Sequence, residues 1–313
     1  MLKAWLELAR ISNLPTVWTN VLAGWMLGGG GFEDSRLIWL LAGASLLYSA
    51  GMIMNDAADA DWDREHRKER PIPRGDVKHG TAWRAGMTML VLGAACMHPF
   101  GGASATHVSC LCFCILAYDL CHKQWAGSVF VMGACRTLLY LAAGSAVKGS
   151  VSLEWNSELI AAALAMGLYI VGISMAARNE SAPVPAARST SFTMLCLLSP
   201  LIAPLAAALL YSLIHEGPYA EPAAIILVRR LGGVYLGGFA VIGLALVMLV
   251  RHAMRMMRTP PLSNIGRAVG LLLAGIVVVD GLAVASLGGF LEGCAIAALT
   301  PLLRLWQRKI AAT

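Results

Sequence analysis

The residues most able to do chemistry are the oxygen-bearing side chains between Asn55 and Asp63, at the end of a long apolar segment. If this stretch is helical, Asn55, Asp59 and Asp63 are spaced four residues apart and share one face. Side chains of this kind at that spacing favour a cation, and Mg²⁺ prefers oxygen ligands and completes its shell with phosphate and water. Polar clusters in membrane segments are costly and mark functional sites. The pattern therefore predicts a membrane enzyme that handles a diphosphate.

Composition indicates which elements must position these residues. Of 313 residues, 58% are hydrophobic and only 13% are charged, about half the charged fraction of a soluble domain. Apolar stretches long enough to span a bilayer recur along the whole chain. The sequence therefore predicts an all-α polytopic membrane protein, a single domain over residues 1–313 with nine or ten transmembrane helices. The expected spans are 14–30, 37–56, 82–101, 104–121, 128–147, 158–177, 191–213, 231–250, 267–287 and, if there is a tenth, 289–305.

The net charge of +6 resides mainly in short connections between apolar segments. Membrane topology therefore explains it better than nucleic-acid binding, and we expect membrane lipid as a partner and no nucleic acid. By the positive-inside rule, the amino terminus and the acidic stretch lie on the cytoplasmic side of the cell (inner) membrane. The 8 cysteines lack the paired spacing of a metal site, so we expect them to pack as small apolar residues.

The acidic stretch continues into a longer motif that ends with Arg70-Pro71 and Gly75. From Asn55 to Gly75 it resembles the signature of the UbiA superfamily of intramembrane prenyltransferases. That signature reads Asn-Asp, two residues, Asp, three residues, Asp, then Arg-Pro and a nearby Gly, and every element is present. Three other places are similar to family positions: the segment Arg10–Asn20, the stretch Tyr118–Lys123, and Arg136.

The resemblance implies a bundle of about nine helices around a central cavity, in which Mg²⁺ is held against the diphosphate of a polyprenyl donor. Ionisation of the allylic carbon–oxygen bond is followed by attack of a membrane-accessible acceptor. Cations and Lys or Arg side chains provide the stabilisation that a leaving diphosphate needs. The resemblance assigns catalysis to Asn55, Asp56, Asp59 and Asp63, metal binding to Asn55, Asp59, Asp63 and Glu180, and diphosphate binding to Arg70, Tyr118, Lys123, Arg136 and Arg178.

The second Asp-rich motif of the family, expected at the end of the sixth span, is altered in this chain. The span ends in Arg178-Asn179-Glu180, which leaves a single carboxylate. Glu180 can still bind one Mg²⁺, and Arg178 can contact phosphate directly. The altered ending is similar to that of the branch encoded in the bacterial Ebo gene cluster. It also leaves open a non-catalytic protein of the same fold, a transporter or a lipid-binding subunit.

Other interpretations of these residues remain at this stage. A CDP-alcohol phosphotransferase is also membrane-bound and rich in Asp, but residues 56–63 lack its Asp-Gly and Ala-Arg pairs. Asp61 lies off the shared helical face, so we expect it to face solvent. Asp119 has Lys123 four residues on as a pairing partner, while Asp280 either pairs with a basic residue in the bundle or lines an acceptor pocket. Donor length, acceptor and oligomeric state are left open.

Overall fold

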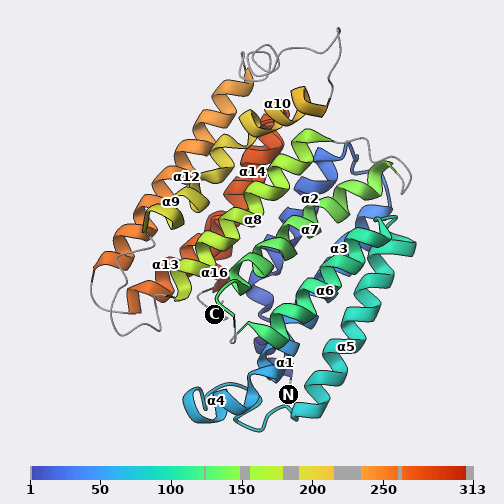
Figure 1. Cartoon of the computed structure of the whole chain (residues 1–313), viewed down its shortest axis with the longest axis vertical. Coiled ribbons are helices and arrows are strands. Elements are labelled where there is room, and N and C mark those ends of the chain that lie inside the picture. The colour runs from blue at the N-terminus through green and yellow to red at the C-terminus, as the bar shows by residue number, and fades with distance from the viewer. Residues whose placement is uncertain are drawn as a thin grey trace.

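The computed structural model describes residues 2–122, 125–148, 156–178, 190–214, 234–259 and 263–307. Every regular element in these residues is helical (Figure 1), as the sequence predicts. The first half contains α1 (Leu2–Leu8), α2 (Leu14–Leu27), α3 (Arg36–Ala58), α4 (Ala60–His66), α5 (His79–Ala95), α6 (Ala105–Cys121) and α7 (Ser128–Lys148). The second half contains α8 (Ser157–Arg178), α9 (Thr190–Leu198), α10 (Ala203–Ile214), α12 (Val234–Arg258), α13 (Ser263–Ala274), α14 (Ile276–Ala285), α15 (Phe290–Ala297) and α16 (Thr300–Gln307).

Six of these helices, some of them composite, are long and apolar enough to cross a membrane, within the described residues. They are α3, α7, α8, the segment 237–258 of α12, and the composite rods 191–212 and 264–285. The helix α6 is apolar but shorter. The remaining predicted spans correspond to α2, to α5 with its extension η2 (Cys96–Phe100), and to the pair α15 and α16. The prediction of a helical, multi-span membrane protein is confirmed.

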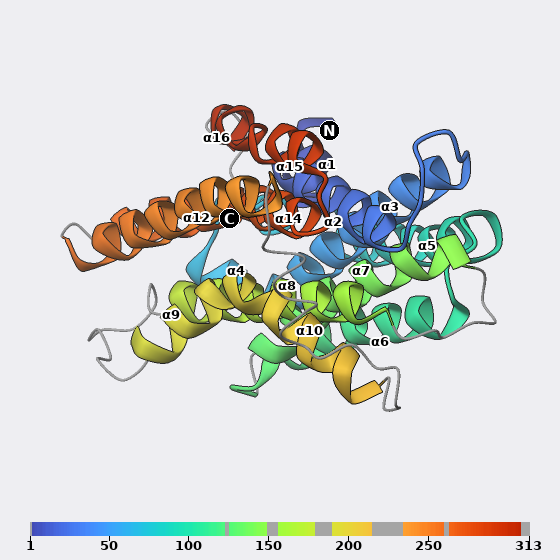
Figure 2. The same ribbon diagram turned by 90° about the horizontal axis from the view of Figure 1, so that it is seen from above.

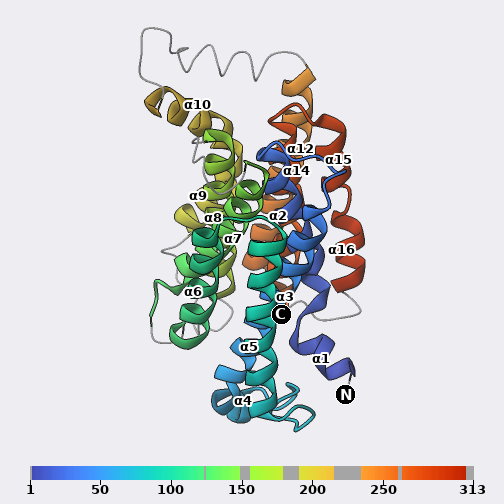
Figure 3. The same cartoon turned by 90° about the vertical axis from the view of Figure 1, so that its right-hand side faces the viewer.

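The last two helices return along the bundle towards its N-terminal end (Figure 3). The helix α15 packs closely on α14, and α16 contacts α13 and η1 (Ile11–Asn13). The Gln307 side chain donates a hydrogen bond to Asn13 Oδ1 at 3.4 Å. The end of α16 therefore lies beside the entry to α2, which is the arrangement that a tenth crossing produces.

Prolines interrupt several of the rods. Pro99 lies inside the π-helical turn η2, and Pro200 begins η4 (Ser199–Ile202) between α9 and α10. A proline has no backbone N–H and clashes with the preceding turn, so a helix bends or changes its winding there. The composite rods are consequently bent rather than straight.

The connection between α3 and α5 projects from one end of the bundle, where α4 lies (Figure 1). Seen along the bundle, α12, α14 and α15 lie on one side, and α6, α9 and α10 lie on the other (Figure 2). The buried apolar residues form two large clusters. One, around Tyr169, draws mainly on α8 and the helices after it, and the other, around Trp25, draws on α2, α3, α5, α6 and α7.

Glycines allow α2 and α7 to approach closely. A Cβ built at Gly24 would lie 2.6 Å from the carbonyl oxygen of Tyr140, and one at Gly28 would lie 2.6 Å from that of Gly144. Between membrane helices, such small residues four apart let backbones meet and gain dispersion energy. This contact holds α7, which also lines the cavity described below, against α2.

We predict that Gly24→Ala lowers stability by about 1–3 kcal/mol, the usual cost of overpacking, because the new methyl group has no room. The midpoint of thermal unfolding of the detergent-solubilised protein measures this. The matched control is Gly80→Ala in α5, where nothing lies within 4 Å of the added Cβ. Equal effects of the two substitutions would contradict the close packing of α2 on α7.

Candidate diphosphate and metal site

The acidic motif occupies the last turn of α3 and the start of α4. Asn55 and Asp56 lie in α3, Asp59 is the residue between the two helices, and Asp63 lies in α4. Asn55, Asp56 and Asp63 are buried. Asn55 Nδ2 and Asp63 Oδ1 have no hydrogen-bond partner among the described residues. Unpaired buried polar atoms are costly, and they typically mark a site that another ligand completes.

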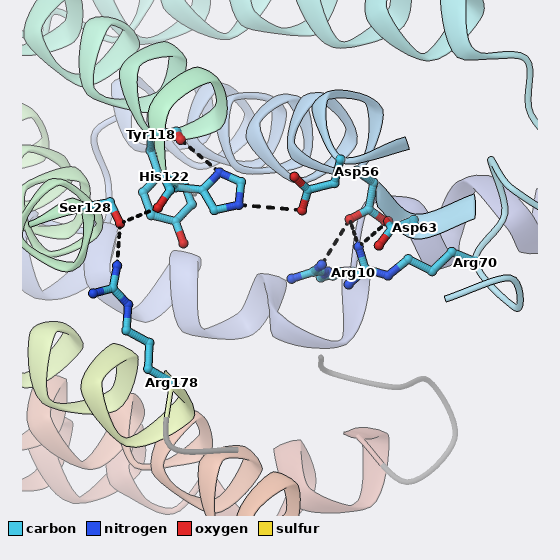
Figure 4. Close-up of polar contacts among 9 residues, drawn as sticks. Arg10, Asp56, Asp63, Arg70, Tyr118, His122, Ser128 and Arg178 are labelled. Atoms are coloured by element: carbon cyan, nitrogen blue, oxygen red, sulfur yellow. Dashed lines mark hydrogen bonds and ion pairs between the residues drawn. The ribbon is translucent and has the colours of Figure 1, made fainter. Parts of the chain in front are cut away.

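Two arginines hold the motif carboxylates in place (Figure 4). Arg70 Nη1 lies 3.0 Å from Asp56 Oδ1 and 2.9 Å from Asp63 Oδ2, and Arg10 Nη2 lies 3.1 Å from Asp56 Oδ1. Burial raises the pKa of Asp63, and the adjacent Arg70 partly opposes this by lowering it. The structure therefore places Arg70, which the sequence assigned to diphosphate binding, on Asp56 and Asp63.

Arg10 reaches this cluster through an unusual backbone conformation. Its φ is 44°, and it is the only non-glycine residue with positive φ in the part of the chain that the structure describes. A left-handed conformation costs a residue with a Cβ on the order of 1 kcal/mol. The ion pair with Asp56, 46 residues away, offsets that cost and aims the guanidinium at the motif.

The third motif carboxylate has a histidine as its partner. His122 Nε2 lies 3.6 Å from Asp59 Oδ2, and the His122 ring stacks on Tyr118 with centroids 5.0 Å apart. His122 was missed at the sequence level. The available signal was its spacing, because His122 is four residues after Tyr118 and shares its helical face.

A chain of hydrogen bonds continues from His122 to the opposite wall (Figure 4). Ser128 Oγ donates to the His122 carbonyl oxygen at 3.1 Å and accepts from Arg178 Nη2 at 2.8 Å. Arg178 also donates to the carbonyl oxygens of Ala126 and Trp125. The last residue of α8 is thereby connected to the α3 motif across the bundle.

A cavity of about 780 Å³ separates these two walls. Its polar lining is concentrated in a few side chains, and its other walls are largely apolar. The described lining residues are Arg10, Asn13, Tyr48, Met52, Tyr118, His122, Trp125, Ala126, Ser128, Val129, Met132, Arg136, Ile170, Ile173, Ser174, Ala177, Arg178 and Leu273. The predicted central cavity is thus present.

A smaller, mainly apolar pocket of about 100 Å³ adjoins this cavity between α2, α3, α6 and α7. The two share Tyr48, Met52, Tyr118, Met132 and Arg136 in their walls. Asp119 lies in the wall of the small pocket, and its Oδ2 has no partner among the described residues. An apolar space that continues from a polar mouth suits a ligand with one charged end and one greasy end.

Arg136 is held at the cavity wall by a buried polar network. Its Nη1 donates to Asn20 Oδ1 at 2.6 Å, and Asn20 Nδ2 donates to both oxygens of Asp280 at 2.8 and 2.9 Å. Tyr140 also donates to Asp280, which is fully buried. Asp280 therefore belongs to a network with a basic residue and does not line the cavity within the described residues.

We predict that Asp280→Ala lowers stability by about 3–5 kcal/mol, the cost of leaving a buried cation without its compensating charge. Asp280→Asn retains hydrogen-bonding capacity and should lose less. Thermal unfolding in detergent measures both. Asp61→Ala is the control, because the Asp61 side chain is 95% exposed, as the sequence predicts. An Asp280→Ala protein that is as stable as the Asp61→Ala control would contradict the role of Asp280 in the buried polar network.

The structure brings most of the candidate site residues to one end of the cavity. Asn55, Asp56, Asp59, Asp63 and Arg70 form one cluster, while Tyr118, Arg136 and Arg178 line the cavity itself. Lys123 and Glu180 lie outside the described residues. Their expected roles stay predictions.

The donor set of the motif fits one Mg²⁺. Asn55, Asp59 and Asp63 offer oxygen ligands at one edge, and one carboxylate oxygen among them, the buried Asp63 Oδ1, has no hydrogen-bond partner among the described residues. Among the described residues, no group of three or more His, Cys, Asp or Glu side chains is arranged to hold a metal ion. Mg²⁺ commonly needs only one or two carboxylates because phosphate oxygens and water complete its octahedron.

Several solved structures share this fold. A structure of digeranylgeranylglyceryl phosphate synthase matches with a TM-score of 0.57 and 18% identity, covering 92% of this chain and 99% of that one. A UbiA homologue from Archaeoglobus fulgidus bound to GPP and Mg²⁺ matches with a TM-score of 0.54 and 13% identity, covering 94% and 99%. At this identity the likeness shows a shared fold.

Curated relatives match shorter segments of the chain. A 4-hydroxybenzoate octaprenyltransferase from Neisseria gonorrhoeae is 28% identical over 146 residues, or 46% of this chain and 49% of the relative. Its counterpart from Cupriavidus pinatubonensis is 37% identical over 84 residues, or 26% of this chain and 28% of the relative. The matched segments thus span between about a quarter and a half of such relatives.

Fold and site together define a helical, multi-span membrane protein with an acidic motif beside a cavity that is lined by three arginines and many apolar side chains. The UbiA prenyltransferase family matches residues 16–264, most of the chain. The protein belongs to the UbiA prenyltransferase family.

Proposed function

We propose that this protein transfers an isoprenoid group from its diphosphate to an acceptor within the membrane, in a Mg²⁺-dependent reaction. The observation that carries the proposal is the cavity of about 780 Å³ lined by Arg10, Arg136 and Arg178. The acidic motif lies beside it and is joined to the lining through the Arg10–Asp56 and His122–Asp59 contacts. The mouth of the cavity is basic, and its depth is apolar. A prenyl diphosphate has the same division, with a charged head and a hydrocarbon tail.

The side chains of this chain supply most of what the reaction needs. Arg10 and Arg70 fix Asp56 and Asp63 in one geometry, so the motif is preorganised before substrate arrives. Asn55, Asp59 and Asp63, with Glu180 as a further ligand, would hold Mg²⁺, which supplies charge stabilisation to the leaving diphosphate. Tyr118, Lys123, Arg136 and Arg178 would orient the anionic head. Apolar walls exclude water from the allylic carbocation.

The relatives suggest an aromatic acceptor, because they are named for transfer to 4-hydroxybenzoate. The acceptor of this chain need only be membrane-accessible and reach the adjoining pocket beside Tyr48 and Tyr118. The Arg178-Asn179-Glu180 ending supports placing the chain in the branch of the bacterial Ebo gene cluster. That placement rests on these three residues alone.

We predict that Asp59→Ala abolishes Mg²⁺-dependent release of diphosphate from geranylgeranyl diphosphate, because the ion loses a ligand. A loss of at least about 100-fold is expected for a metal-ligand change of this kind. Release by the purified protein, with and without added Mg²⁺, is the measurement.

The matched control for this assay is Asp61→Ala, which removes a carboxylate two residues away that faces solvent. It should release diphosphate at the rate of the unmodified protein. Unchanged release by Asp59→Ala would refute the metal assignment. No release by the unmodified protein, with binding intact, would favour a non-catalytic lipid-binding or transport role.

We further propose that the amino terminus and the acidic motif face the cytoplasm. The basic residues between α3 and α5 support this, because positive charge in short connections is retained on the cytoplasmic side. The contact of Gln307 with Asn13 supports the same side for the end of α16.

Reporter fusions test this topology. Fluorescent protein fused to either terminus should fluoresce, since both lie in the cytoplasm. Alkaline phosphatase fused after Gly288, in the turn between α14 and α15, should be active because that turn faces the other side. Active phosphatase at the carboxyl terminus would exclude the tenth crossing.

A further inference from the structure

The acidic motif on α3 and α4 and the end of α8 differ in charge. The motif lies beside the cavity, next to the lining residues Arg10 and His122, and its Asp63 Oδ1 has no hydrogen-bond partner among the described residues. The last residue of α8 is Arg178. The cavity is lined by Arg10, Arg136 and Arg178, and no Asp or Glu is among its described lining residues.

Arg178 has the geometry of a fixed cationic group. Its described contacts are the carbonyl oxygens of Trp125 and Ala126 and the hydroxyl of Ser128. These partners are neutral, so within the described residues they orient the guanidinium without cancelling its charge. Arginine stays protonated at every physiological pH.

Arg178 and Arg10 act on the same space. Both line the same cavity, and Tyr118 lines it with them. Arg10 is committed to Asp56 on the motif wall, while Arg178 has no described carboxylate partner. An anion in the cavity is therefore attracted more strongly by Arg178 than by Arg10, because the charge of Arg10 is already balanced by Asp56.

The sequence after α8 offers little to hold a second divalent ion. Between residues 179 and 189 the single carboxylate is Glu180. A second Mg²⁺ beside a fixed guanidinium would be repelled by its charge. The three described hydrogen bonds of Arg178 use three of its five N–H groups, so two remain to donate to phosphate oxygens.

We propose that the site is asymmetric, with one divalent ion on the α3–α4 wall and Arg178 in direct contact with the diphosphate on the α8 wall. This deepens the proposed function and depends on it for the identity of the anion. The complex then contains a single divalent ion for each bound diphosphate.

Counting Mn²⁺ tests the stoichiometry without relying on turnover. Purified protein is titrated with Mn²⁺ at saturating inorganic pyrophosphate, a ligand that cannot react further. The Mn²⁺ bound by the protein is counted by equilibrium dialysis, in which the complex of Mn²⁺ with free pyrophosphate distributes equally across the membrane and is subtracted. One Mn²⁺ per protein is expected, and two ions or none would overturn the proposal.

A variant series tests the role of Arg178. Arg178→Gln should weaken pyrophosphate binding at saturating Mg²⁺ by about tenfold or more, the value of a charge-assisted hydrogen bond. Geranylgeraniol has no diphosphate, so the variant should bind it with an affinity within twofold of the unmodified protein. If the substitution instead collapsed the loop 125–128, geranylgeraniol binding would weaken as well. Arg84→Gln on the exposed face of α5 is the control. Equal weakening of pyrophosphate and geranylgeraniol binding, or no weakening of pyrophosphate binding, would contradict a direct contact between Arg178 and the diphosphate.

The outcomes separate this inference from the proposed function. A protein that binds one Mn²⁺ and needs Arg178 for pyrophosphate, yet shows no prenyl transfer, keeps the asymmetric site and loses the enzymatic activity. A protein that transfers prenyl groups with two ions keeps the activity and loses the asymmetric site.

Discussion

The structure depends on one constraint, which is that a charge inside a bundle surrounded by hydrocarbon must have a partner. The chain meets it in different ways at different depths. At the mouth, Asp56 and Asp63 share the guanidinium of Arg70. Within the bundle, Asn20 mediates between Arg136 and the fully buried Asp280. Arg10, Arg136 and Arg178, each held by polar partners, also line the cavity, and this makes it suitable for an anionic ligand.

The polar cluster and the packing of the helices depend on one another. The close approach of α2 and α7 at Gly24 brings Asn20 and Arg136 within hydrogen-bonding distance. Asp280 adds α14 to the same network, so three helices from both halves of the chain are connected at one point. The α8 wall is attached separately, through Arg178 and the turn that holds Ser128. An enzyme of this kind needs such rigidity because diphosphate departure is aided only by groups already in position.

Sequence reasoning reached the helical fold, most span positions and the acidic motif, because these are local properties of composition and spacing. Asp61 was predicted to face solvent from its helical phase alone. The long-range pairs were not predictable in this way. Arg10 meets Asp56 across 46 residues, and Asn20 meets Asp280 across 260. The His122–Asp59 pair depends on how α6 lies against α3. Nothing in a single sequence fixes these distances, although an isolated Asp in an apolar segment correctly indicated a hidden partner.

The contact between Asn20 and Asp280 has a consequence for how the protein is made. The ribosome releases α2 and α7 into the membrane long before α14 has been translated, so Arg136 enters the lipid without the acid that later balances it. Until then the nascent chain must keep that guanidinium hydrated or covered by the insertion machinery. Chains that terminate early would expose the same unbalanced group and become natural targets for membrane proteolysis.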